Sequence, residues 1–551
     1  MKKSKSALLV TYAFAAGLRR YSIPIVAAEA LAVIFAAAGP LVQKYMIDGT
    51  AFTLNWKVFY AAALLAVLMG GQFVLRGLGR FMRGLLGVEV RKNLKSTIFR
   101  HLLALPEDFL RSRGAGYFFN RIQHDINEIS SFVSGNALLL FSETLKLILS
   151  MLICFYLDWR CGVLLIPFLL LQIFCCYLFR QRQYMLSRKL LECTAVERHV
   201  MQEFLASHRT LKSHAAEVNA GERIDSGLSR WGDLMRSRLK NENIFLACVQ
   251  LPVWFCGGII LVSGLYMVML KQTTLGEVWA LLLLMNMVFA PARSLGAIFI
   301  HKQTAEAAWE RLMELRQQEV EDDVEESGRI NLAGDIIFKK ICFAYDNKRD
   351  ILKNLDLCVP WRSGVFLCGA NGSGKSTLFS LLLRLYKPQA GSISVNGRDI
   401  VEYPLSSYRE RIGYIGQYPE FIDGTVRENL LLGRKNISDE KIMELFRQLE
   451  CADLIERQAE KLDYRVAERG ENFSGGERLR LVLVRELLRD TDWILFDEAA
   501  ANLDLAGRQN FYALLQKLPG DKGVIAIVHD VPENSNWPVL NLSELQNNNT
   551  I

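Results

Sequence analysis

Apolar residues are gathered into six long runs within the first 297 residues of the chain. The runs lie near 22–43, 58–79, 136–157, 161–179, 244–268 and 276–297. A helix needs about 20 mostly apolar residues to cross a bilayer, so each run predicts one membrane-spanning helix. A shorter apolar stretch at 7–17 is followed by Arg19 and Arg20, which favours a helix over 1–21 that lies along the membrane surface.

The polar connections between these runs are of two kinds. Residues 80–135 and 180–243 are long, rich in Lys and Arg, and helical in pattern, whereas the short connections carry only Lys44, Lys57, Arg160 and Lys271. Basic residues favour the cytoplasmic side of a membrane, and the basic N-terminus agrees with this orientation. We therefore expect both ends of the chain in the cytoplasm.

The pattern changes after residue 310. A charged stretch at 311–334 predicts a linker, and short β-rich runs such as 335–344 and 493–497 then alternate with helical patterns. This alternation predicts an α/β domain with parallel strands. The chain thus divides into a surface helix at 1–21, a six-span α-helical membrane domain at 22–310, the linker, and an α/β domain at 335–551.

Composition supports this division. Hydrophobic residues make up 51% of the chain and charged residues 22%, and the formal net charge is +7. A positive charge is compatible with nucleic-acid binding, but here the basic residues flank the apolar runs, as the cytoplasmic bias of membrane proteins predicts. We expect the lipid bilayer, and no nucleic acid, among the partners.

The first candidate binding motif of the α/β domain is a glycine-rich loop. Residues 369–377 read Gly-Ala-Asn-Gly-Ser-Gly-Lys-Ser-Thr, between a β run and an apolar helix, which is the context that the P-loop motif G-x-x-x-x-G-K-[ST] requires. Such a loop surrounds phosphates with backbone N–H groups, its lysine reaches the β and γ phosphates, and its serine hydroxyl binds Mg²⁺. The predicted nucleotide-binding residues here are Gly369, Asn371, Gly372, Ser373, Gly374, Lys375, Ser376 and Thr377.

A second motif ends in two acids. Residues 493–498 read Trp-Ile-Leu-Phe-Asp-Glu, an apolar strand followed by carboxylates that are costly to bury unless a cation or water meets them. This is the Walker B pattern. It predicts Asp497 as a Mg²⁺ ligand and Glu498 as the residue that polarises the water attacking the γ-phosphate.

Between these motifs, residues 474–477 read Ser-Gly-Gly-Glu before a basic helix. The tetrapeptide alone fits a helix start with Ser474 as the N-cap. About 20 residues before a Walker B strand, however, it resembles the signature sequence of ATP-binding cassette (ABC) transporters. The resemblance implies that Ser474, Gly475, Gly476 and Glu477 of one subunit close on ATP held by another.

Other family motifs follow in the expected order. By resemblance, Tyr345 stacks on adenine, with Phe343 as the competing candidate and core packing as the alternative for both. Gln417 matches the Q-loop and contacts Mg²⁺ together with Ser376 and Asp497, and 467–470 resembles the exporter X-loop. Asp504 belongs to a D-loop that binds nucleotide, and His529 matches the catalytic histidine that holds the γ-phosphate beside Glu498.

The membrane half also resembles the half-transporters of ABC exporters. The similar segments include 40–48, 105–109, 116–125, 158–160 and 275–277. The resemblance implies a homodimer in the bacterial inner (cytoplasmic) membrane, with a heterodimer as the alternative. It also implies that loop tips near 113–116 and 207–212 dock on cassettes.

The chain departs from the family pattern at two places near the site. Glu477 stands where the family usually has Gln, and Ala499-Ala500 stands where Pro-Thr or Ala-Thr is usual. A carboxylate still accepts hydrogen bonds, and the alanines touch no phosphate chemistry. We therefore expect hydrolysis to be retained.

These features predict an ATP-hydrolysing exporter that works by alternating access with ATP and Mg²⁺. The six runs exclude a soluble cassette protein acting on ribosomes or DNA, and intact Glu498 and His529 argue against an ATP-gated channel. For the substrate, family analogy alone favours a peptide or peptide-like natural product. The alternatives are a lipid or lipid-linked oligosaccharide, and an amphipathic drug.

Glu29, Glu143 and Lys146 are ionisable residues inside the predicted spans. Charge is costly there, so it usually faces a cavity or a partner. Glu143 and Lys146 are three residues apart on one helix and can form an ion pair. A pair is favoured, and a cavity-lining role is the alternative.

Overall fold

The computed structural model describes residues 19–50, 56–321, 330–345, 350–435, 437–501, 503–516, 518, 520, 522–529, 531 and 536–548. The predicted surface helix at 1–21 lies almost entirely outside these residues. The chain forms two compact units, one of residues up to 103 with 115–318 and one of 104–114 with 319 onward. We call them the membrane unit and the cassette unit. The boundaries at 310 and 334 remain predictions.

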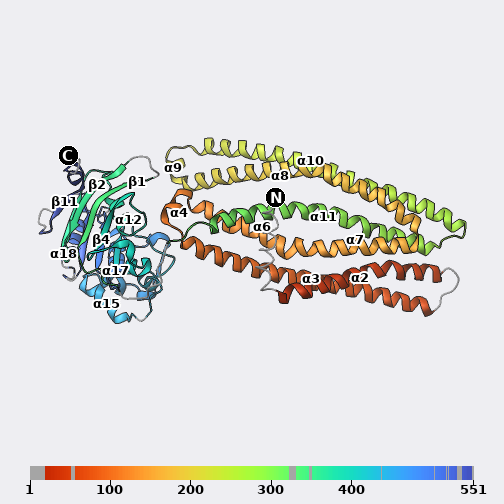
Figure 1. The fold of residues 1–551 in the computed structure, drawn as a ribbon, viewed down its shortest axis with the longest axis horizontal. Helices are drawn as coiled ribbons and strands as arrows, with labels where there is room; N and C mark the ends of the chain where they lie inside the picture. The colour runs from red at the N-terminus through yellow and green to blue at the C-terminus, as the bar shows by residue number, and fades with distance from the viewer. Residues whose placement is uncertain are drawn as a thin grey trace. The chain divides into compact units, whose positions relative to one another are not determined.

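The membrane unit consists of long helices, and each of the six predicted apolar runs lies in a different one. This confirms the predicted number of spans. Helices α2 and α3, α7 and α11, and α8 and α10 pack along one another (Figure 1). The helices are α2 (Arg19–Thr50), α3 (Trp56–Leu103), α5 (Ala115–Asn120), α6 (Ile126–Ser131), α7 (Ala137–Leu157), α8 (Trp159–Ala206), α9 (His208–Ser213), α10 (Glu217–Met269) and α11 (Leu275–Arg316).

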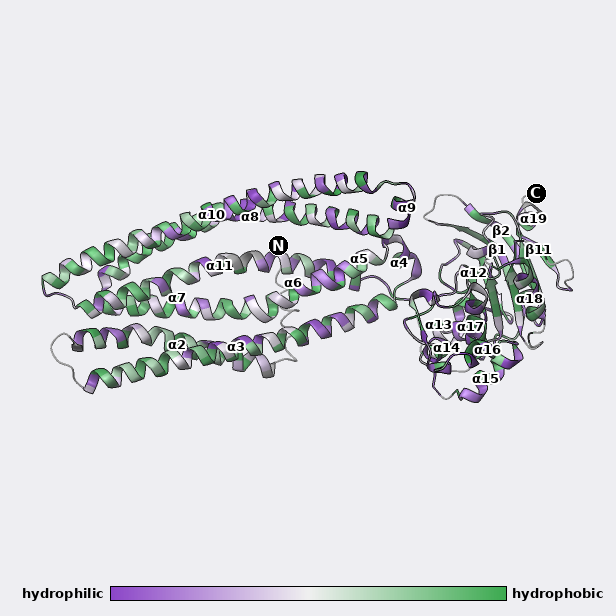
Figure 2. Cartoon of the chain, turned by 180° about the vertical axis from the view of Figure 1, so that it is seen from behind, coloured by the Kyte–Doolittle hydropathy of each residue, from purple (hydrophilic) through white to green (hydrophobic). Residues whose placement is uncertain are grey.

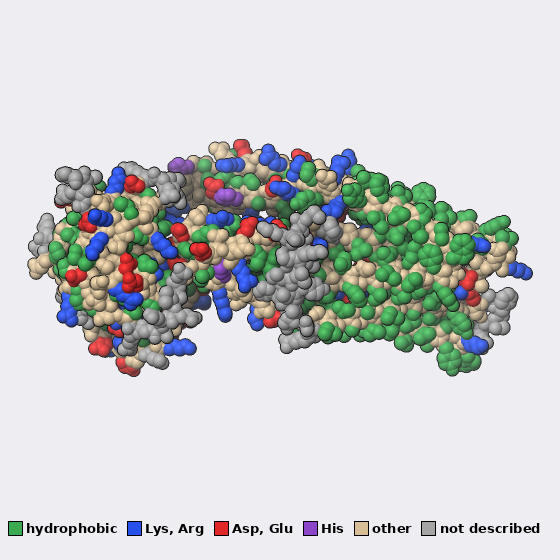
Figure 3. Space-filling model, in the orientation of Figure 1, with side chains coloured by type: hydrophobic (Ala, Val, Ile, Leu, Met, Phe, Trp, Pro, Cys, Tyr) green, Lys and Arg blue, Asp and Glu red, His purple; other side chains and the backbone are tan. Residues whose placement is uncertain are grey.

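These helices continue far beyond the apolar runs, as the helical pattern of the two long polar connections predicts. On the face seen in Figure 3, apolar side chains cover one half of the unit and many Lys and Arg side chains lie on the other half. The hydropathy along the helices changes in the same way (Figure 2). Large side chains such as Phe73 and Trp254 are 81% and 73% exposed on the apolar half. That exposure is favourable only where lipid replaces water.

Local capping explains where two of the helices begin. At the tight turn after α7, the Asp158 carboxylate accepts a 2.9 Å hydrogen bond from the backbone N–H of Arg160 and starts α8. At the start of α11, Thr274 and Glu277 form a reciprocal capping box. Each device satisfies N–H groups that a helix start leaves without an intrahelical partner.

Several charged groups within the membrane unit form ion pairs. Arg83 of α3 forms an ion pair with Glu29 of α2, which is 7% exposed. Lys146 Nζ lies 3.7 Å from the Glu143 carboxylate, as the pairing hypothesis predicts. At one end of α2, Lys44 donates to Glu277 of α11 at 2.7 Å. Pairing reduces the cost of placing charge away from water.

The third membrane helix contains two π-helical turns, η1 (Arg121–Asp125) and η2 (Phe132–Asn136). Asp125 ends the first turn and is 2% exposed. Arg311 of α11 donates two hydrogen bonds to its carboxylate, at 2.6 and 3.1 Å, and Arg121 donates a third. These contacts place the Asp125 carboxylate against α11.

The cassette unit contains two main sheets and confirms the predicted α/β domain with parallel strands. One sheet is antiparallel, in the order β2-β1-β4-β5, and the other is parallel, in the order β11-β3-β10-β9-β6. The main strands are β1 (Ile336–Ala344), β2 (Asp350–Val359), β3 (Gly364–Cys368), β4 (Ala390–Val395), β5 (Arg398–Asp399), β6 (Ile412–Ile415), β9 (Trp493–Asp497), β10 (Gly523–Ile527) and β11 (Val539–Asn541).

A short strand pair, β7 (Gly424–Thr425) with β8 (Arg465–Val466), and several helices complete the unit. The helices are α4 (Glu107–Arg113), α12 (Lys375–Leu382), α13 (Leu405–Glu410), α14 (Val426–Leu431), α15 (Asp439–Gln448), α16 (Asp453–Glu456), α17 (Gly475–Leu487), α18 (Leu505–Gln516) and α19 (Leu542–Asn548), with 3₁₀ turns η4 (Ile400–Glu402), η5 (Lys461–Asp463) and η6 (Glu468–Gly470).

Alternate residues of the parallel strands enter two hydrophobic cores. In β9, Ile494 and Phe496 join the core with α17 and α18, whereas Trp493 and Leu495 join the core with β1, β2 and α12. Successive side chains of a strand point to opposite faces, so a strand covered on both sides is apolar throughout. The register pairs Asp497 at the end of β9 with Ile527 at the end of β10, which brings the residues after both strands to one edge.

Candidate nucleotide site of the cassette

The glycine-rich loop joins β3 to α12 through backbone conformations that favour glycine. Gly372 and Gly374 have φ angles of +80° and +96°, a region that side chains with a Cβ rarely adopt. A Cβ on Gly374 would also lie 2.7 Å from the side chain of Leu352. The sequence folds here into a tight loop that ends at the N-terminus of an eight-residue helix.

Lys375 is the first residue of that helix and is 6% exposed. Its ammonium group donates to the carbonyl oxygens of Gly369 and Ala370, at 2.9 and 3.2 Å. The lysine therefore bends back over the loop of which it is part, where a phosphate held by the loop's N–H groups would meet its positive charge.

Ser376 and Asp497 come together although 121 residues separate them. The Ser376 hydroxyl donates to Asp497 Oδ1 at 2.9 Å, and the Tyr414 hydroxyl donates to Oδ2 at 3.2 Å. Burial raises the pKa of Asp497, and both hydrogen bonds oppose that rise. Hydroxyl and carboxylate oxygens are ligands that suit Mg²⁺, so these two residues fit the predicted metal site.

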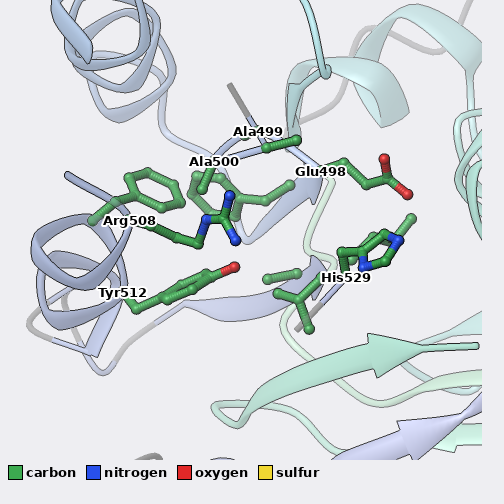
Figure 4. A pocket seen from close by; sticks show the side chains of 12 residues that line it. Glu498, Ala499, Ala500, Arg508, Tyr512 and His529 are labelled. Carbon is green, nitrogen blue, oxygen red and sulfur yellow. The ribbon is translucent and has the colours of Figure 1, made fainter. Parts of the chain in front are cut away.

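Glu498 and His529 follow β9 and β10 and line one cavity of about 210 Å³. Figure 4 shows them on one side of the cavity, with Arg508 and Tyr512 of α18 on the other. Gln417 Nε2 donates to the Glu498 carboxylate at 3.3 Å. The structure thus gathers three predicted site residues at one edge of the parallel sheet, and the small side chains of Ala499 and Ala500 form part of the wall.

The two aromatic candidates for adenine differ in their surroundings. Phe343 is 5% exposed and belongs to a hydrophobic core. Tyr345 is only partly buried, and its hydroxyl lies 3.3 Å from Thr377 Oγ1 of the phosphate loop's helix. Tyr386 packs edge-on against Tyr345, with ring centroids 5.1 Å apart. These positions favour Tyr345 over Phe343 as the adenine contact.

Tyr386 also connects this aromatic group to α4, which follows the first membrane extension. A hydrogen bond from Arg111 of α4 to Tyr386 raises the pKa of Arg111. Residues 104–114 accordingly group with the cassette unit and not with the membrane unit. The docking role of the first loop tip, near 113–116, stays a prediction.

The predicted signature begins α17. Ser474 is its N-cap, and it forms a reciprocal capping box with Glu477. Glu477 also forms an ion pair with Arg457. Gly476, in the first turn of α17, lies close to Leu503 of the predicted D-loop. In the same D-loop, the Asp504 carboxylate accepts a 2.9 Å hydrogen bond from the backbone N–H of Gly507. Ser474, Gly475 and Gly476 therefore form a second helix start with N–H groups suited to an anion.

Two residues of this region escaped the sequence-based prediction. Tyr414 lies three positions before Gln417, and its hydroxyl meets Asp497 because β6 pairs with β9 in parallel register. Arg457 precedes the signature by 17 positions and reaches it through the fold of α16. No local pattern distinguishes either residue from an ordinary tyrosine or arginine.

Two family models match the sequence. The model described as ABC transporter transmembrane region matches residues 23–292, and the model described as ABC transporter matches residues 352–501. Together they cover most of the chain. The chain belongs to the ABC transporter family.

Relatives of known name align with nearly the whole transporter. It is 25% identical to an ATP-dependent lipid A-core flippase of Pectobacterium atrosepticum over 91% of this chain and 88% of that one. It is also 25% identical to a multidrug resistance ABC transporter ATP-binding and permease protein of Lactococcus lactis, over 85% and 79%. These alignments confirm a membrane domain and a cassette fused in one chain.

A solved structure shares the fold. The structure of a bacterial Atm1-family ABC exporter with ATP bound superposes with a TM-score of 0.83 at 21% identity, covering 97% of this chain and 99% of that one. This confirms the predicted exporter-type fold. The family models and the named relatives confirm an ATPase coupled to transport. The transporter is a multi-pass membrane protein that binds ATP.

Proposed function

We propose that two copies of this chain form a homodimeric exporter with two equivalent ATP sites in the bacterial inner (cytoplasmic) membrane. In each site, Gly369–Thr377 and Tyr345 of one copy hold ATP, and Ser474–Gly476 of the other copy close on its γ-phosphate. Ser376, Asp497 and Gln417 hold Mg²⁺, which supplies positive charge against the phosphates. Asp504 supports this interface from the D-loop.

The proposal rests on one observation. Gln417 donates to Glu498, which lines a cavity together with His529 and directly follows Asp497, the partner of Ser376. Water attacks the γ-phosphorus, the bond to the β-phosphate oxygen breaks, and Glu498 accepts the proton that the water loses. His529 holds the γ-phosphate during this step. Because ATP adds contacts only when the two cassettes close, its binding shifts the dimer toward that state.

Glu498→Gln tests the hydrolytic role. The amide is a far weaker base, so we expect ATPase activity to fall at least about a hundredfold while ATP binding persists. The variant should accumulate as a closed dimer with two nucleotides, measured by native mass spectrometry. The matched control is Glu440→Gln, which neutralises an exposed acid of α15. Near-normal hydrolysis by Glu498→Gln would overturn the assignment.

For the substrate, the names of the relatives support an amphipathic molecule with a large apolar part, of the lipid or drug class. The predicted peptide substrate rests on family analogy alone and becomes the alternative. Transport into vesicles of a fluorescent lipid, a cationic amphipathic dye and a peptide separates the classes. Uptake of the peptide alone, abolished by Glu498→Gln, would reverse this preference.

A further inference from the structure

Arg457 contacts Glu477, the residue at which this chain departs from the usual signature sequence. Arg457 Nη2 donates to Oε1 of the Glu477 carboxylate. The other oxygen, Oε2, accepts a 2.7 Å hydrogen bond from the backbone N–H of Ser474, and the N–H of Glu477 donates to Ser474 Oγ at 3.3 Å. One carboxylate thus links Arg457 to the serine that opens the signature.

The backbone of Arg457 is positioned by a hydrogen bond to the short helix that precedes it. Arg457 is the C-cap that follows α16, and its backbone N–H donates to the Asp453 carbonyl at 3.1 Å. Leu454 and Ile455 of the same short helix are buried in the core that also contains Leu479 and Val482 of α17. The two ends of the ion pair therefore approach each other from elements that pack into one core.

The ion pair offsets an electrostatic conflict at this helix start. A helix N-terminus attracts anions through its free N–H groups and its dipole. A carboxylate in the first turn uses part of that attraction and repels an incoming phosphate, whereas the neutral Gln that is usual here does neither. A guanidinium next to the carboxylate restores the positive potential that the carboxylate removes.

Glu477 needs this partner because it carries its charge at neutral pH. Burial raises the pKa of its carboxyl group, but hydrogen bonds from Ser474 and Arg457 outweigh that effect and hold the pKa below its usual value. A proton therefore does not neutralise the carboxylate in the working range. Only a neighbouring cation can do so.

We infer that Arg457 is a positioning residue of the signature: it neutralises Glu477 and fixes the capping box, so that the helix start of α17 can accept the γ-phosphate of ATP held by the partner copy. The inference rests on the proposed homodimeric ATP site. It assigns a role to an arginine outside every motif of the cassette and explains how the chain tolerates Glu477.

The test measures closure of the full-length dimer, not hydrolysis. In a Glu498→Gln parent carrying spin labels on its cassettes, the ATP concentration for half-maximal closure is measured for each variant. We expect Arg457→Ala to raise it about fivefold, the scale of one charge at a helix terminus. Arg457→Lys should keep most of the parent's affinity because it keeps the charge.

Rescue identifies the cause. Adding Glu477→Gln to Arg457→Ala should return closure to within about twofold of the parent, because no unpaired charge then remains at the helix start. Glu477→Gln alone should lower the ATP concentration for half-maximal closure, because the positive charge of Arg457 is then no longer offset by the carboxylate. The matched control is Arg398→Ala, which removes an arginine of similar exposure that is ion-paired with Glu402; it should leave closure unchanged.

The outcomes separate the two proposals. A parent that does not close with ATP overturns the proposed homodimeric site before any Arg457 variant is measured. If the parent closes and Arg457→Ala closes equally well, the inference alone is wrong. A loss that persists after Glu477→Gln is added would show a packing role without charge compensation, and that result also overturns the inference.

Discussion

The membrane unit and the cassette unit place charged and apolar side chains in opposite ways. In the cassette unit, Trp493 and Phe366 are fully buried, and the Glu498 carboxylate follows a strand end and lines a cavity. In the membrane unit, Phe73 and Trp254 are largely exposed, whereas Glu29, inside a predicted span, is buried and paired. The surrounding solvent explains why the two units differ: exposed apolar side chains are stable in contact with lipid, whereas lipid cannot hydrate a charged group.

The comparison also shows where functional information resides. The cassette's chemistry depends on short motifs whose backbone geometry is local, such as the loop at 369–374. In the membrane unit, charged residues meet across different helices, as Glu29 meets Arg83 and Asp125 meets Arg311. A motif residue of the cassette can therefore be assigned a role from the sequence, whereas Arg457 of the cassette and the paired residues of the membrane unit are recognised only by their partners.

The largest effect is expected from Lys375→Ala. It removes the ammonium group that meets the phosphates, and the loss of one electrostatic contact of this kind lowers the rate by up to about a thousandfold. ATP hydrolysis and ATP binding should both be lost, in contrast to Glu498→Gln. Lys387→Ala, an exposed lysine five residues beyond α12, serves as the control. Retained nucleotide binding would show that the phosphate-loop motif does not predict the role of Lys375.

The next effect concerns a buried pair. Glu29→Ala leaves Arg83 without its partner inside the membrane unit, and an unpaired buried charge destabilises by about 3 kcal/mol. We expect a lower denaturation temperature and less folded protein in detergent. The exposed cassette pair offers the contrast, since Glu402→Ala, which removes the partner of Arg398, should change stability by less than about 1 kcal/mol.

A smaller loss in the Glu29→Ala, Arg83→Gln double variant would show that the unpaired charge causes the instability. Full stability of the single variant would show that water or lipid headgroups reach Arg83. In that case the contrast between the two units would not extend to Glu29.

Tyr414→Phe should have a moderate effect. It removes the hydroxyl that holds Asp497 Oδ2 and leaves the Ser376 contact in place. The carboxylate then has more freedom to rotate, so the Mg²⁺ concentration for half-maximal ATP binding should rise about threefold, as expected for one hydrogen bond. Tyr418→Phe, on a residue that is 71% exposed, is the control. An unchanged Mg²⁺ requirement would show that Ser376 alone orients Asp497.

The smallest effect is expected from Glu143 and Lys146. They form an ion pair one helical turn apart, and such pairs contribute about 0.5 kcal/mol or less. Replacing both, by Glu143→Gln with Lys146→Met, should leave expression, stability and transport nearly unchanged. Lost transport of a cationic dye with stability intact would instead support the cavity-lining role, and would add these residues to the substrate pathway.

Much of the cassette could be predicted from its sequence because its motifs are local. The β runs at 335–344 and 493–497 became β1 and β9, and the phosphate loop stands between a strand and a helix as expected. Tyr414 and Arg457 could not be predicted in the same way. Their partners, Asp497 and Glu477, lie 83 and 20 residues away and are reached only through strand pairing and helix packing.

By itself, the sequence determined the six spans, the α/β cassette and the ATPase chemistry, since each rests on residue types at short, fixed spacings. The tertiary structure decided which of these residues meet: Ser376 with Asp497, Gln417 with Glu498, Arg457 with Glu477, and Arg83 with Glu29. The physical reason is that periodicity and turn chemistry act within a few residues, whereas the ion pairs and hydrogen bonds of a site join elements that only the packed core brings together.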